Sequence, residues 1–186
     1  DRTYLLSGLL RGQAGTEYAI ADPLPAGAPF VLLDASLLPL ARGLDALDRT
    51  LDLRIVASGR SHDDPTAVAL SVTPGNAALL PLSPVHVTAT RRDDGIHIGW
   101  IRRTRTDGDG WNAEVPLGED AEAYTLDILS GGAVKRSIAC AAPAAIYATA
   151  DELADFGVLQ SSLHLRVVQL SSAVGAGHAA ELTLTL

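Results

Sequence analysis

Histidines are the residues best suited to acid–base or metal chemistry in this chain of 186 residues. They are scattered, and no pair has the spacing of a zinc motif or an accompanying cysteine pair. His86, His97 and His164 fall in runs that alternate apolar and polar residues, where a solvent-facing side chain is expected. His62-Asp63-Asp64 is typical of a solvated turn. The sequence therefore predicts no metal site and no cofactor.

The sequence also contains no motif typical of a nucleophilic catalytic site or of a phosphate-binding loop. Gly12-Gln13-Ala14-Gly15-Thr16 lacks the lysine and the spacing of a phosphate loop, and no Gly-x-Ser-x-Gly elbow occurs. Asp107-Gly108-Asp109-Gly110 resembles the start of a calcium loop, but the twelfth position is Gly118 rather than glutamate. Cys140 lies between alanines and is expected to be a small buried hydrophobe. We therefore expect this chain not to be an enzyme.

The strongest candidate binding site is a long excursion that contains Arg102, Arg103, Arg105 and Trp111. Tryptophan on a glycine-rich loop stacks on a sugar ring or fills a protein pocket, and arginine forks hold carboxylates through two hydrogen bonds. In the alternative arrangement, Trp111 folds back to cap the protein core, with the arginine stems packed beside it. The sequence leaves both possibilities open.

The elements that must position this excursion are short strands with a period of two, separated by glycine, proline and aspartate turns. Seven of them are predicted, at 85–90, 95–102, 122–129, 133–138, 145–149, 162–170 and 179–186. Gly131-Gly132 is expected to close one hairpin and Gly175-Ala176-Gly177 another, with a single helical turn near 150–155. This pattern predicts a fibronectin type III-like (immunoglobulin-like) antiparallel sandwich. Its expected core comprises Trp100, Tyr124, Leu126, Ile128, Leu165 and Val167.

The first part of the chain is predicted to be a smaller β-rich unit. Strands are expected at 3–11, 28–33, 51–57 and 66–73, with a short helix within 35–48. Pro81 and Pro84 discourage sheet pairing, so we place a boundary there and divide the all-β chain into domains at 1–82 and 83–186.

Charge and hydropathy exclude other classes. The net charge of −8 disfavours a nucleic-acid-binding protein, which needs a basic surface. No apolar run approaches the roughly 20 residues of a membrane-spanning helix, so no membrane insertion is expected. No signal peptide is visible, and the chain has no methionine, even at position 1. We expect it to be a piece of a longer protein.

Several motifs together resemble those of one known family. The first is the segment Tyr4-Leu5-Leu6-Ser7-Gly8-Leu9-Leu10-Arg11-Gly12-Gln13-Ala14-Gly15-Thr16-Glu17. The others follow in order: Trp100, Arg102-Arg103, Trp111, Pro116-Leu117-Gly118-Glu119, Tyr124, Val167-Val168-Gln169-Leu170-Ser171 and Gly175-Ala176-Gly177. In this order they resemble the C-terminal region of the distal-tail (baseplate hub, host-specificity) proteins of gene transfer agents and related siphophages. The resemblance covers nearly the whole chain.

The resemblance implies a structural and adhesion segment of a tail-tip protein, contributing to baseplate assembly and host-envelope attachment. Its partners would be other tail and baseplate subunits and a host cell-surface polysaccharide or receptor. Such a protein is synthesised in the bacterial cytoplasm and ends in the distal tail of a virion-like particle. The alternative is a carbohydrate-binding accessory domain of a secreted enzyme, with Trp111 as the stacking platform.

Overall fold

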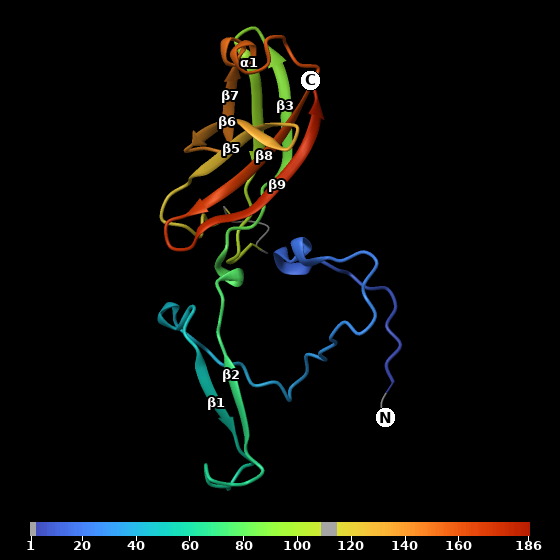
Figure 1. Cartoon of the computed structure of the whole chain (residues 1–186), viewed down its shortest axis with the longest axis vertical. Coiled ribbons are helices and arrows are strands. Elements are labelled where there is room, and N and C mark those ends of the chain that lie inside the picture. The colour runs from blue at the N-terminus through green and yellow to red at the C-terminus, as the bar shows by residue number, and fades with distance from the viewer. Residues whose placement is uncertain (1–2, 109–114) are drawn as a thin grey trace. The chain divides into compact units, whose positions relative to one another are not determined.

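The computed structural model describes residues 3–108 and 115–186, and its best-packed part is an antiparallel β-sandwich (Figure 1). One sheet has the order β3-β4-β7. Its strands are β3 (Val85–Arg92), β4 (Gly95–Ile101) and β7 (Ala144–Ala148). The other has the order β6-β5-β8-β9. Its strands are β5 (Tyr124–Ser130), β6 (Ala133–Cys140), β8 (Ser162–Ser171) and β9 (Gly175–Thr185). This arrangement of three strands on four confirms the fibronectin type III-like sandwich.

The core lies between the two sheets. All six residues expected there are buried, at 5% exposed or less: Trp100, Tyr124, Leu126, Ile128, Leu165 and Val167. The rings of Trp100 and Tyr124 meet edge to face, with their centroids 5.2 Å apart. Alternation along each strand places these residues inward and their neighbours outward, because successive side chains of a strand point to opposite faces.

The turns follow the glycine signals in part. Gly131 and Gly132 join β5 to β6, and both have positive φ (57° and 81°), as a two-residue hairpin connection requires. The turn between β8 and β9 lies earlier than the expected Gly175-Ala176-Gly177, because Ser171 already pairs with Gly175. The glycines there begin β9 instead of forming the turn.

One α-helix, α1 (Thr149–Phe156), connects β7 to β8. It ends at Gly157, which has φ 75° and donates its N–H to the carbonyl of Leu153. A left-handed glycine is a common helix C-terminus because it has no Cβ to strain. The helix has two turns where the sequence predicted one.

The chain enters and leaves the sandwich at opposite ends. Pro81, just before β3, accepts a hydrogen bond from the N–H of His178 near the start of β9 (2.9 Å). At the other end, the N–H of Leu186 bonds the carbonyl of Ser161 (3.0 Å), which follows α1 in the chain. Figure 1 shows β3 and β9 running side by side between these two ends.

The chain forms two compact units. The first contains the described residues before Pro25 together with Leu79–Leu186, and the second is Pro25–Ala78. This grouping differs from the predicted division at 82/83, and whether 83–186 folds alone stays a prediction. The strand expected at 3–11 is wrong: this segment is irregular and exposed, and Gly8 and Gly12 have positive φ. Two 3₁₀ helices follow it, η1 (Gln13–Gly15) and η2 (Glu17–Ala19).

The second unit contains a single hairpin, β1 (Leu51–Ile55) with β2 (Val68–Val72). The strand expected at 28–33 is not formed, and the helix expected within 35–48 is reduced to the 3₁₀ turn η3 (Leu44–Ala46). A further 3₁₀ turn, η4 (Ala77–Leu79), follows the hairpin. One face of the hairpin carries three apolar cross-strand pairs: Leu51–Val72, Leu53–Leu70 and Ile55–Val68.

Candidate functional site

Arg102 binds the segment that follows the long excursion, at Val115 and Pro116. Its Nη1 and Nη2 donate to the carbonyls of Pro116 (2.7 Å) and Val115 (2.5 Å). Its Nε lies 3.7 Å from the carboxylate of Glu122, which also accepts a hydrogen bond from the hydroxyl of Tyr124 (2.6 Å). Burial and this neighbouring carboxylate raise the pKa of Tyr124 far above its ordinary value. The guanidinium therefore fastens the loop to the edge of the core.

Arg103 connects the sandwich to the N-terminal segment. Its Nε donates to the carbonyl of Ser83 and one Nη to the Ser83 hydroxyl, both at 2.8 Å. It also forms an ion pair with Glu17, whose pKa is lowered chiefly by this hydrogen bond. The next residue, Tyr18, stacks on His178 with ring centroids 3.8 Å apart. We call residues 12–20 the N-terminal clasp, because they bind the sandwich through these contacts.

Arg105 is also bound by its own chain. It pairs with the carboxylate of Glu119 at 2.5 Å and approaches the carbonyl of Gly118 at 3.4 Å. The three arginines thus lie on one loop but face separate internal acceptors. Trp111 lies outside the described residues. A ligand-binding role for these four residues stays a prediction, and the contacts give the arginines a structural one.

Two histidines pair with single carboxylates on the strand surfaces. His97 Nε2 lies 2.7 Å from Asp94, whose pKa is lowered by this contact, and His164 Nε2 lies 2.9 Å from Glu181. His86 is exposed. Within residues 3–108 and 115–186, no three histidine, cysteine or acidic residues gather as a metal site would require. Cys140 is partly buried against the core, and burial raises the pKa of its thiol.

Around α1 the structure places a polar network that the sequence did not reveal. Glu152 is fully buried and accepts two hydrogen bonds from Arg91, each 2.8 Å, and one from the N–H of Gln160 (2.6 Å). Arg136 donates two hydrogen bonds to the carboxylate of Asp155, at 2.6 and 3.0 Å, and the Tyr147 hydroxyl donates one to the same carboxylate at 2.7 Å. Arg91 comes from β3 and Arg136 from β6, so α1 is tied to both sheets.

A second polar group crosses the outer face of the larger sheet. Asp127 on β5 lies between Ser137 on β6 and Arg166 on β8, its register partners. It accepts hydrogen bonds from both, those from Arg166 at 2.6 and 3.0 Å. These bonds satisfy a carboxylate that is 6% exposed. Each charge faces an opposite partner on the next strand, which stabilises the pairing.

The outer face of the smaller sheet is hollowed. The hollow is lined by Thr88, Thr90, Arg92, His97, Ile98, Gly99, Ala144, Ala145 and Ile146. Across the three strands, Thr88, Gly99 and Ala144 form one row, and Thr90, His97 and Ile146 form the next. The first row has the smaller side chains and the second row the larger ones. We call this depression the outer-face hollow. Sequence reasoning missed it, and the signal was the glycines on either side of His97.

No family model matches the sequence, and a comparison with curated proteins finds no match. Among solved structures, the chain is similar to the extracellular region of rat CD45, domains d3–d4, at 10% identity and a TM-score of 0.42. The alignment covers 100% of this chain and 83% of that one. In the described residues, no helix has the length and apolar character needed to cross a membrane.

Proposed function

We propose that this chain is a structural and adhesion segment of a tail-tip protein in a phage-like particle of the gene-transfer-agent type. It binds other baseplate subunits and contacts the host envelope, and it carries out no catalysis. Its place is the distal tail of the particle, after synthesis in the bacterial cytoplasm.

The observation that carries this proposal is the large amount of apolar surface left exposed before residue 73. Its members include Leu5 (96%), Leu33 (81%) and Leu38 (85%). The hairpin adds Ile55, Val68, Leu70 and Val72, all exposed on its apolar face. Monomeric proteins rarely leave a large contiguous apolar patch uncovered, and such patches mark sites of protein association; the apolar face of the hairpin is the candidate for one here. A subunit held between other subunits has such a surface.

The sandwich supports the adhesion part of the proposal. Its buried core and its cross-strand hydrogen bonds keep the two sheets rigid, whereas the loops at its ends vary without disturbing the core. The sequence motifs that resemble those of gene-transfer-agent distal-tail proteins favour this role. The likeness in fold alone would fit many binding functions.

Incorporation into particles tests the proposal. In a bacterium that makes the particles, Leu53→Asn with Leu70→Asn places polar groups on the apolar face of the hairpin. We expect particles to lose this protein, because unpartnered polar groups buried in an apolar interface are costly. Arg54→Ser, on the other face of the same hairpin, is the matched control and should assemble normally.

Gold labelling of an epitope after Leu186 should mark the tail tip in electron micrographs. Label on the capsid, or normal incorporation of the double variant, would refute the proposal. A purified double variant that has lost the cooperative unfolding of the sandwich would make the particle result uninterpretable, so its melting curve is measured first. We expect that curve to be unchanged, because the substitutions lie outside the sandwich.

A further inference from the structure

The hairpin of β1 and β2 is a sheet of two strands, so each strand has one open edge (Figure 1). Among the described residues, no backbone hydrogen bond joins β1 to any segment other than β2. An open edge presents unpaired N–H and C=O groups, which makes it a template for another strand. An isolated two-stranded hairpin is at best marginally stable in water, and a sheet needs three or more strands with an apolar face. The hairpin therefore has both the means and the need to gain a strand.

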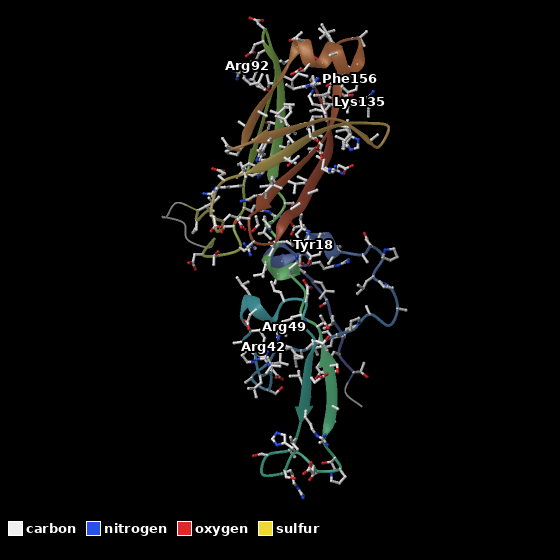
Figure 2. All side chains as sticks on the ribbon, turned by 60° about the vertical axis from the view of Figure 1, so that its left-hand side comes forward. Tyr18, Arg42, Arg49, Arg92, Lys135 and Phe156 are labelled. Carbon is white, nitrogen blue, oxygen red and sulfur yellow. The ribbon has the colours of Figure 1, made fainter. Side chains whose placement is uncertain are left out.

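Charged side chains distinguish the edge of β1 from that of β2. Asp52 and Arg54 flank the central residue of β1 and are exposed on the face opposite the apolar one, whereas β2 has no charged residue. The Ser71 hydroxyl donates a hydrogen bond to Asp52 at 2.6 Å, and within the described residues Arg54 has no ion-pair partner. Figure 2 shows the side chains of the hairpin below the labelled Arg49, which lies just before β1.

We propose that β1 pairs with β1 of a second copy of this chain, antiparallel and about a two-fold axis at Leu53. In this register Leu53 faces Leu53 of the second copy, and Leu51 faces Ile55. Asp52 of each copy faces Arg54 of the other, so the axis gives two ion pairs on one face. A two-fold interface has this self-complementarity, because the same surface of both copies meets. The product is a four-stranded sheet in the order β2-β1-β1-β2.

The charges of β1 favour this register over its neighbours. A slip of two residues would place Asp52 opposite Asp52 or Arg54 opposite Arg54, and like charges directly opposite are destabilising. Parallel pairing in register would oppose the same like charges. A slip of one residue would bring charged side chains onto the apolar face. Backbone hydrogen bonds supply affinity in strand addition, and the side chains supply specificity.

The inference deepens the proposed function, on which it rests for the role of the hairpin in assembly. Residues opposite each other in a sheet point to the same side, so the apolar faces of the two hairpins join into one. The dimer thereby offers other subunits twice the apolar surface of a single copy.

Sedimentation velocity of the purified 186-residue chain tests the inference, and we expect a reversible dimer as the concentration rises. Asp52→Arg places arginine opposite arginine in both pairs and should raise the dimer dissociation constant about tenfold. Arg54→Asp should weaken the dimer similarly. An equimolar mixture of the two variants should restore it, since every pair then joins opposite charges. Asp63→Arg makes the same charge change in the loop between β1 and β2 and should have no effect.

Cysteine substitution checks the register. Residues directly opposite in an antiparallel pair have α-carbons about 4.5–5.5 Å apart, within reach of a disulfide. Mild oxidation of Leu53→Cys should therefore link two copies rapidly. Leu70→Cys on β2 and the parent chain, whose single cysteine Cys140 is partly buried, should not be linked at that rate.

Three outcomes would overturn the inference: a monomer at every concentration, a mixture that does not restore the dimer, or faster linking at Leu70 than at Leu53. The melting curve of each variant is recorded first, and a restored mixture also shows that both variants fold. Arg54→Ser removes an attraction without adding a repulsion, and exposed ion pairs contribute little, so it still serves as the control for incorporation into particles. A chain that is monomeric in solution yet incorporated into particles would refute the pairing and leave the proposed function standing.

Discussion

Replacing Glu152 by glutamine should destabilise the sandwich more than any other single-atom change in α1. The carboxylate is fully buried, and it accepts three hydrogen bonds, two from Arg91 and one from the N–H of Gln160. An amide has the same shape, but its NH₂ group would face a donor, and the charge that balances Arg91 would be lost.

The size of the effect follows from these contacts. Removing one partner of a fully buried ion pair costs about 3–5 kcal/mol. The Arg91 side chain is 30% exposed and water solvates part of the orphaned guanidinium, so we expect about 2–4 kcal/mol. For a chain of this size, that loss lowers the melting temperature by roughly 10 °C. Asp151→Asn is the same chemical change one residue earlier, on a side chain that is 45% exposed, and should have little effect.

The free energy of unfolding that Glu152→Gln loses should also depend on pH. The hydrogen bonds from Arg91 lower the pKa of Glu152 below its ordinary 4.5. A carboxyl whose pKa is lowered in the folded state contributes stability that is fully present above its unfolded pKa and is lost as the pH falls through the folded value. Chemical denaturation of wild type and Glu152→Gln should therefore give a constant difference above about pH 5 and a shrinking one below it. Equal midpoints of the two proteins at pH 7 would refute the reasoning.

Three further predictions follow from the same structure. Trp100→Ala should cost about 3–5 kcal/mol in urea denaturation, since Trp100 is 5% exposed and packs on Tyr124; a loss under 1 kcal/mol would contradict its core position. The fragment 83–186 should fold with dispersed amide resonances, because all seven strands of the sandwich lie within it. It should melt at a lower temperature than a fragment that also retains the N-terminal clasp, and an aggregated product would show that the two parts share one core. Arg105→Ala with Trp111→Ala should weaken attachment of particles to cells without changing assembly, and unchanged attachment would remove this loop from recognition. Arg105→Ala alone should lower the melting temperature slightly, because Glu119 loses its ion pair; a much larger loss in the double variant would make Trp111 a cap of the core.

The sandwich could be predicted from the sequence because several of its strands, such as β4 and β8, alternate buried and partly exposed residues along much of their length. In Gly95–Trp100, for example, every second residue is an apolar side chain that the opposite sheet buries, and this local pattern needs no knowledge of the partner. The apolar runs at 3–11 and 28–33 lack that alternation. Their leucines remain exposed, and β-propensity without a paired strand does not form a sheet.

The contacts at the candidate site could not be predicted in the same way. The sequence predicted Arg103 as a ligand-binding residue, and it did not predict the ion pair that the structure shows with Glu17, which lies 86 positions earlier. Pairing over that separation depends on where the N-terminal clasp docks, which no local pattern encodes. The network around Glu152 was missed for a similar reason: an acidic residue in a short helix is usually solvated, and only the fold places Arg91 beside it.

The opposite placement of the entry and exit of the sandwich has a geometric consequence. Pro81 lies beside His178, and the strand from His178 to Leu186 extends about 27 Å. A group fused after Leu186 would therefore stand roughly one sandwich length from Pro81, on the far side of a rigid body. The sandwich thus fixes the distance between Pro81 and Leu186, and a pair of fluorophores attached at these two points would report that distance directly.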